Sequence, residues 1–359
     1  MNSWNLTIFP FLIAAVIAGV ITPVVIRVYK KFGWVVDPNR TKHPAHTHKE
    51  PVPKGGGISV VLGTLLTVVV LLPIDKHLLA IMLAGALVMI VGVLDDIYDL
   101  SPYLRLVTNL LAALMVVGAG IGISYITNPL GGGVIMLDKG VSWGGEKQVM
   151  VLADLLALLW IPFVMNAVNW SKGLDGQLPG IVVVAGVVIG VLSFRYSADV
   201  AQWPVAVLAF ALAGSYAGYL PFNFYPQKSM PGYGGGSFAG FMLATLAILS
   251  TTKIGTALVV LGIPLIDAVY IGIRRIFQGK SPVWGDRGHL HHKLMDLGWG
   301  KRKVAVFYWL VTAVLGFMAL RLDSRQKFYT MVLVSLLLGA FLLWVSYGRY
   351  LGRRDRDSG

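Results

Sequence analysis

Long apolar segments, separated by short charged or glycine- and proline-rich segments, make up most of this sequence. Residues 58–72 contain no charged side chain, and residues 254–269 contain one. About 20 apolar residues cross a bilayer as a helix, which satisfies its own backbone polar groups there. The pattern predicts an all-α polytopic membrane protein with about 10–11 transmembrane helices. The predicted spans are 6–26, 57–73, 77–94, 104–126, 150–168, 179–194, 203–220, 236–250, 254–272, 304–320 and 328–347.

The composition supports a single integral membrane domain over residues 1–359. Apolar residues make up 56% of the chain and charged residues 13%, which excludes ordinary soluble and disordered proteins. Because the chain has no cysteine, thiolate catalysis, disulfides and cysteine-ligated metals are also excluded. Residues 2–7 contain no Lys or Arg, so a cleavable signal with a basic start is not expected.

Charged residues gather on one predicted side of the membrane. With the N-terminus outside, the internal segments hold 22 of the 30 Lys and Arg residues, as the positive-inside rule requires of cytoplasmic loops. Most acidic residues fall in the same segments, which that rule does not require, so we expect a polar site at the cytoplasmic face. Nucleic acid is not an expected partner. The predicted active-site segments are 27–56, 95–105, 166–178, 221–237 and 273–303, and 128–148 is predicted as a small external β-hairpin.

Two glycine-rich segments precede predicted helices. Lys54 is followed by Gly55, Gly56 and Gly57, and residues 232–236 contain four further glycines. Glycines before a helix let backbone N–H groups approach an anion, and Lys54 adds a full positive charge. The alternative for the first segment is a bend at the start of a membrane helix, and the alternative for the second is close helix packing.

Three carboxylates lie within one helical turn at the inner end of the third span. Asp95 and Asp99 share one helix face, and Asp96 lies beside them. Such a cluster is tolerated when it is solvated, when one member binds a proton, or when a cation sits between its members. Acids at the membrane boundary indicate function more strongly than a solvated helix end.

Two later segments carry further polar groups. Asn166, Asn169 and Asp175 offer donors and acceptors for a sugar, base or phosphate, although interhelical carboxamide contacts are the alternative. The last internal loop places imidazoles among cations, which suits pyrophosphate binding; a zinc site or a solvated loop are the alternatives. Its candidate binding residues are Asp267, Arg274, Arg275, Asp286, Arg287, His289, His291 and His292.

In these motifs, over nearly the whole chain, the sequence resembles the polyprenyl-phosphate N-acetylhexosamine-1-phosphate transferase family. Its members start lipid-linked glycan synthesis for O-antigen, teichoic acid and peptidoglycan. The His-x-His-His form at 289–292 resembles the branch that uses a bare UDP-N-acetylhexosamine. The resemblance implies an enzyme of a bacterial or archaeal plasma membrane that transfers a sugar 1-phosphate from a UDP-sugar to undecaprenyl phosphate. UMP is the second product, and a homodimer is one possible assembly.

The resemblance also implies roles for individual residues. Asp95 or Asp96 would deprotonate or orient the lipid phosphate, and Lys54 would hold it. Asp175 would serve the nucleotide or Mg²⁺, so that Asp95, Asp96 and Asp175 form the implied metal site. The Arg287 guanidinium and the three imidazoles would hold the diphosphate.

Two positions depart from the family pattern, because Lys172 and Gly234 stand where the family has aspartates. Metal binding should therefore be weaker, and we expect the Lys172 ammonium to replace part of the cation's work as a catalytic residue. Two other functions stay open on the sequence. One is a catalytically silent relative that binds a UDP-sugar or polyprenyl phosphate, which the lost aspartates favour. The other is a transporter, which charges at the ends of the spans disfavour.

Overall fold

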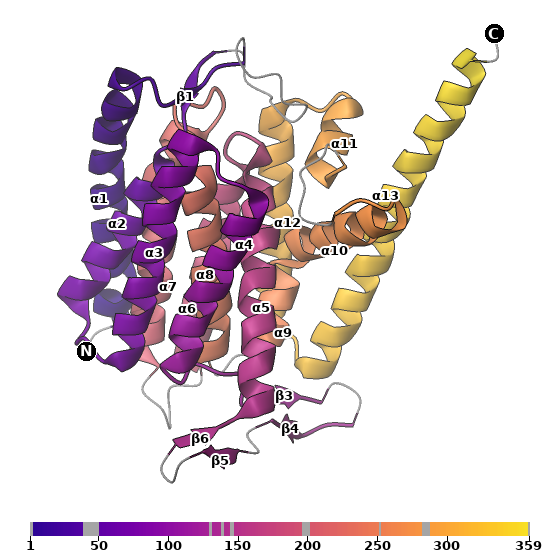
Figure 1. Cartoon of the computed structure of the whole chain (residues 1–359). Helices are drawn as coiled ribbons and strands as arrows, with labels where there is room; N and C mark the ends of the chain where they lie inside the picture. Colours follow the sequence, from indigo (N-terminus) through magenta and orange to yellow (C-terminus); the bar gives the residue numbers. More distant parts are fainter. Residues whose placement is uncertain are drawn as a thin grey trace.

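The chain folds into a helical bundle with small two-stranded sheets at its two ends (Figure 1). The computed structural model describes residues 3–38, 50–128, 131–137, 140–143, 147–195, 202–250, 253–281 and 288–357. The helices are α1 (Ser3–Lys31), α2 (Gly56–Leu71), α3 (Lys76–Tyr98), α4 (Pro102–Gly118), α5 (Val151–Trp170), α6 (Gln177–Arg195), α7 (Trp203–Asn223), α8 (Gly232–Leu249), α9 (Lys253–Val260), α10 (Gly262–Phe277), α11 (Leu290–Asp296), α12 (Lys301–Arg321) and α13 (Ser324–Asp357), with a 3-10 turn, η1 (Ser171–Gly173).

The all-α polytopic prediction is confirmed, since each of the eleven predicted spans is helical. Within the described residues, eight helices are long and apolar enough to cross a membrane, and α9 with α10 makes a ninth as a bent pair. The apolar helices α2 and α4 are shorter than a full crossing. The predicted span 104–126 is too long, because α4 ends at Gly118 and Gly120 then turns the chain at φ +99°.

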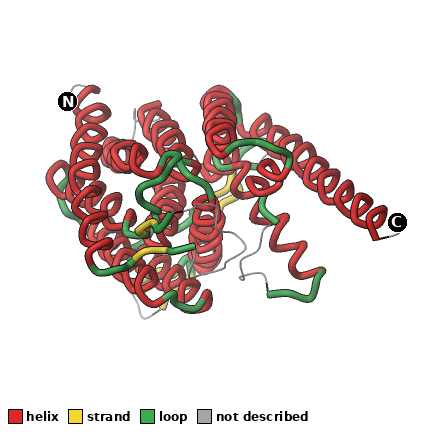
Figure 2. Tube along the Cα trace, turned by 90° about the horizontal axis from the view of Figure 1, so that it is seen from above, coloured by secondary structure: helices red, strands yellow, loops and turns green. Residues whose placement is uncertain are grey.

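The predicted span 254–272 is broken rather than straight. The helices α9 and α10 meet at an angle of 83°. Pro264 has no N–H to donate to the carbonyl of Val260, which removes one helical hydrogen bond at the bend. As a result α10 leaves the bundle sideways toward α13, which itself extends away from the bundle (Figures 1 and 2).

The bent helix α10 has a polar inner edge and an apolar outer edge. Asp267 and Arg275 are buried. The outer edge is exposed from Val269 to the end of the helix, through Ile273, Ile276 and Phe277. This arrangement is the reverse of a soluble amphipathic helix, and it fits a helix that faces lipid.

Glycines allow α2, α3 and α8 to pack almost backbone to backbone. A Cβ on Gly92 of α3 would lie 2.5 Å from the Cα of Gly234 in α8, and a Cβ on Gly57 of α2 would lie 2.6 Å from the backbone nitrogen of Gly235. Small residues at such crossings are the usual basis of close helix packing in membranes. The alternative of close packing is therefore correct for residues 234–235, and Gly57 lies in the same kind of contact.

The two ends of the bundle carry different features. The N-terminus and the sheets β3 to β6 lie at the lower end of Figure 1, whereas β1 and α11 lie at the upper end. The predicted hairpin 128–148 is two hairpins, because the turn at Gly132 and Gly133, both with positive φ, closes one pair and residues 141–149 pair separately. The strands are β1 (Val35–Val36), β2 (Val52–Pro53), β3 (Tyr125–Thr127), β4 (Val134–Met136), β5 (Val141–Trp143) and β6 (Lys147–Val149).

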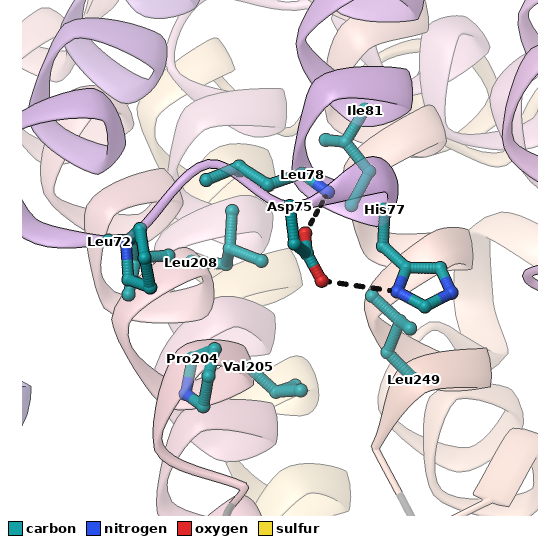
Figure 3. A pocket seen from close by; sticks show the side chains of 10 residues that line it. Leu72, Asp75, His77, Leu78, Ile81, Pro204, Val205, Leu208 and Leu249 are labelled. Atoms are coloured by element: carbon teal, nitrogen blue, oxygen red, sulfur yellow. Dashed lines mark hydrogen bonds and ion pairs between the residues drawn. The ribbon is translucent and has the colours of Figure 1, made fainter. Parts of the chain in front are cut away.

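A cavity of about 220 Å³ lies where α3 begins, between the start of α7 and the end of α8 (Figure 3). Its lining is apolar apart from Asp75 and His77. The Asp75 carboxylate accepts a hydrogen bond from the backbone N–H of Leu78 at 2.8 Å and caps α3. This bond, with His77 beside it, lowers the pKa of Asp75. The cavity is separated from Asp95 by the length of α3.

Candidate active site

All five segments predicted to form the polar site contact one another at the upper end of the bundle. The backbone N–H of Met230 donates to the carbonyl of Pro53 at 2.8 Å. The Tyr233 hydroxyl donates to the carbonyl of Arg105 at 3.0 Å. His291, from the last segment, lies against Gly173. Polar groups that are far apart in the sequence therefore share one region.

The turn between α3 and α4 gathers two of the predicted carboxylates around one cation. Asp99 ends α3 in the left-handed conformation at φ 49°, and Ser101 caps α4 by accepting from the N–H of Leu104. The turn brings Arg105 back over α3, where its Nε donates to the buried Asp95 at 2.6 Å. Its Nη2 donates to the exposed Asp99 at 2.9 Å. The predicted repulsion is thus relieved by an arginine that the sequence reasoning missed.

Asp96 lies beside two lysines, Lys54 and Lys172. One of its oxygens accepts a hydrogen bond from the Tyr29 hydroxyl at 3.3 Å, whereas Oδ1 is buried without a partner. Lys54 and Lys172 both act electrostatically on Asp96 and are only partly buried. Among the described residues, neither ammonium forms a hydrogen bond or ion pair. Two lysines without an ion-pair partner, beside a half-buried carboxylate, suit the binding of an anionic ligand.

The loop that carries His289, His291 and His292, here called the imidazole loop, is held by Asp267 of α10. This carboxylate accepts a hydrogen bond from Nδ1 of His289 at 2.8 Å and from the backbone N–H of Leu290 at 2.9 Å. Both bonds are buried. Asp267 therefore fixes the start of α11 and the orientation of the His289 ring, which is a positioning role.

The rings of the loop stack against the end of α5. His289 and His291 are parallel at 5.6 Å, and His292 lies 4.3 Å from His291. The ring of Trp170 lies 5.4 Å from the ring of His289. The buried Arg275 guanidinium lies over the same Trp170 ring, 5.2 Å from its centre. Trp170 thus joins the segment that carries Lys172 to the imidazole loop.

His291 is the ring closest to η1. A Cβ on Gly173 would lie only 2.5 Å from its Nε2. That nitrogen is buried and has no hydrogen-bond partner among the described residues. Burial, with His292 and His289 beside it, lowers the pKa of His291 well below its usual value. The ring is therefore neutral at pH 7 and has one polar atom left to bind a ligand.

Asp175 is paired within the protein. Its Oδ1 is 3.3 Å from Nζ of Lys301 at the start of α12, and its Oδ2 accepts from the backbone N–H of Gln227 at 3.3 Å. Asp95 is likewise held by Arg105. Among the described residues, no group of three or more His, Asp or Glu side chains is placed to hold a metal. The metal site implied for Asp95, Asp96 and Asp175 stays a prediction.

The remaining predicted residues have varied surroundings. Asn166 donates to the carbonyl of Pro162 at 2.8 Å, a bond within its own helix. The Oδ1 of Asn169 is buried against Gly236 without a hydrogen-bond partner. Arg274 lies against Gly288. Asp286 and Arg287 fall outside the described residues.

Sequence reasoning missed Arg105, Trp170 and Lys301. Trp170 had a signal, because it stands inside the polar run between Asn169 and Lys172. Arg105 is the one cation in the segment 95–105. Lys301 begins a run of three basic residues that the topological bias of cytoplasmic loops already explains, so nothing marked it out.

Comparison with known proteins identifies the family. The model of glycosyl transferase family 4 matches residues 78–251, which include Asp95, Asp96 and Lys172. A decaprenyl-phosphate N-acetylglucosaminephosphotransferase of Mycobacterium leprae is 30% identical over 75% of this chain and 73% of its own. A probable undecaprenyl-phosphate N-acetylglucosaminyl 1-phosphate transferase of Bacillus subtilis is 27% identical over 91% of this chain and 88% of its own. An undecaprenyl-phosphate alpha-N-acetylglucosaminyl 1-phosphate transferase of Escherichia coli O157:H7 is 29% identical over 89% of this chain and 84% of its own. This polytopic chain, with its acids, lysines and imidazoles gathered at one end, belongs to glycosyl transferase family 4.

Proposed function

We propose that this protein transfers N-acetylglucosamine 1-phosphate from UDP-N-acetylglucosamine to a polyprenyl phosphate and releases UMP. The names of its relatives support the sugar and the lipid phosphate. The observation that carries the proposal is the pair Lys54 and Lys172, which form no hydrogen bond or ion pair among the described residues and lie beside the half-buried Asp96. Both substrates are anions, so a transferase must offer cations that no protein group has already neutralised.

The surrounding groups suit the two substrates. Lys54, at the start of α2, holds the lipid phosphate. Asp96 orients that phosphate and accepts its proton when it arrives singly charged. The imidazoles serve the sugar diphosphate, and His291 is held in place where its Nε2 lies against Gly173. Trp170 and Arg275 hold the imidazole loop in place.

The proposed setting is the cytoplasmic face of a bacterial plasma membrane. UDP-sugars are soluble nucleotides, and a polyprenyl phosphate places its headgroup at the membrane surface. The segments richest in Lys and Arg lie at the same end of the bundle as Asp96, which supports a cytoplasmic orientation for that end. We infer undecaprenyl phosphate as the acceptor. A homodimer stays a proposal that native mass spectrometry would test.

Transfer assays with purified protein in lipid nanodiscs test the function. The protein is incubated with undecaprenyl phosphate and each of a panel of UDP-sugars, and released UMP is measured. We expect UMP to form with UDP-N-acetylglucosamine and only when the lipid is present. Asp96→Asn should lower the rate at least about 10²-fold while expression and melting temperature stay unchanged. The absence of UMP with every donor, by a protein that still binds UDP, would instead establish a catalytically silent relative.

A further inference from the structure

We propose that Lys172 and Lys54, and not a resident Mg²⁺, neutralise the diphosphate in this chain. The inference rests on the proposed function for the identity of the ligand. It starts from a test of whether the residues present fit a metal ion. Mg²⁺ is usually held by one or two carboxylates together with substrate phosphates, in octahedral geometry.

The carboxylates at the site do not fit a resident Mg²⁺. Asp175 is engaged by Lys301, and Asp95 is engaged by Arg105 at 2.6 Å. Among the described residues, Asp96 is the member of the predicted metal set with a buried oxygen that has no hydrogen-bond partner, and two ammonium groups act on it. A divalent cation placed at Asp96 would be repelled by both lysines, so the positive charges that are already present take its place.

The helix α8 cannot supply the missing ligand. Gly234 lies against α3, where a Cβ would be 3.3 Å from the Cα of Gly92. The other residues at the start of α8 are buried as well, through Gly232, Tyr233, Gly235 and Gly236. The Tyr233 hydroxyl is already used, because it also donates to Asn109 at 2.7 Å. No carboxylate enters the site from this helix.

Lys172 occupies the position from which a cation can act on the diphosphate. Asp95, Arg105, Lys54 and Asp96 are the charges that act on it, so all of these groups share one neighbourhood. Its neighbour Gly173 lies against His291, which places the ammonium between the carboxylates and the imidazole loop. Together Lys172 and Lys54 carry the same formal charge as one Mg²⁺.

The reaction balances with these groups alone. An oxygen of the lipid phosphate forms a bond to the sugar-bearing phosphorus of the UDP-sugar. The bond from that phosphorus to the bridging oxygen breaks, and its electron pair leaves with UMP. Negative charge therefore develops on the bridging and terminal oxygens of UMP, where the Lys172 ammonium stabilises it.

The experiment measures UMP release and UDP binding in nanodiscs, each with EDTA and with added Mg²⁺. For the wild-type protein we expect both quantities to change less than about twofold between the two conditions. Lys172→Met should weaken UDP binding and lower the rate by about 10²-fold, the usual effect of losing one charge-stabilising donor. Lys172→Arg should keep tighter UDP binding and a higher rate of UMP release than Lys172→Met. Lys76→Met, an exposed lysine at the opposite end of α3, is the matched control and should behave as wild type.

The two proposals fail in different ways. UMP release that is normal with Mg²⁺ and abolished by EDTA overturns the lysine proposal and leaves the transferase intact. If no UMP forms in either condition, the proposed function fails, and calorimetric binding of UDP still decides the inference. The inference is overturned if UDP binding requires Mg²⁺ and is unchanged in Lys172→Met. It is supported if UDP binding is unchanged by EDTA and is weaker in Lys172→Met.

Discussion

Replacing Gly173 by alanine should disable the site while leaving the fold intact. The new Cβ would lie 2.5 Å from Nε2 and 2.9 Å from Cε1 of His291, whereas ordinary contacts begin at 3.4 Å. The His291 imidazole must therefore move by about 0.9 Å. A displacement of about 1 Å in a catalytic geometry costs on the order of 10²-fold in rate. We expect kcat for UMP release to fall by that factor.

The control for this variant is Gly272→Ala. A Cβ on Gly272 of α10 meets nothing within 4 Å, so both rate and melting temperature should match the wild-type protein. Both variants add one methyl group, and only one of them adds it against the imidazole loop. Wild-type turnover by Gly173→Ala, at wild-type stability, would refute the reasoning that His291 must sit against η1.

Three further predictions concern stability, measured as melting temperature in nanodiscs. Gly92→Ala puts a methyl group 2.5 Å from the backbone of α8 and should destabilise the protein by about 1–3 kcal/mol, whereas Gly118→Ala, with open space, should not. Lys301→Met leaves the buried Asp175 unpaired, at a cost of about 3–5 kcal/mol, and adding Asp175→Asn should restore part of the loss. If the double variant is no more stable than the single one, the ion pair is not the cause. The pKa of His291 is lower in the folded protein than in the unfolded chain. Below about pH 6.5 the unfolded chain therefore binds a proton at His291 that the folded protein does not bind. Stability should therefore fall with acidification more in wild type than in His291→Gln; parallel pH curves would contradict this.

The helices were predictable because the signal for a membrane span is local. Hydropathy alone marks an apolar segment. The helical period alone places Asp95 and Asp99 on one helix face, and in the structure both accept hydrogen bonds from Arg105. The bend between α9 and α10 also had a local signal in Pro264. The length of the segment concealed it, because 254–272 is long enough for a straight crossing.

The partners within the site were less predictable, because they come from distant parts of the chain. Glycine-rich segments suit both anion binding and close packing, and only the position of Gly234 against Gly92 decides between them. The sequence places imidazoles and acids in separate loops and does not say which acid holds which ring. The bond from His289 to Asp267 is a fact of tertiary structure.

The outward apolar edge of α10 has a consequence for anyone who purifies this protein. The helix that carries Asp267 is supported by the bundle on one flank, and by acyl chains on the other, along Val269, Ile273 and Phe277. An amphiphile that covers this flank poorly weakens the support for the helix that holds the imidazole loop. The measured rate will therefore depend on the choice of solubilising agent, even when the overall fold survives extraction.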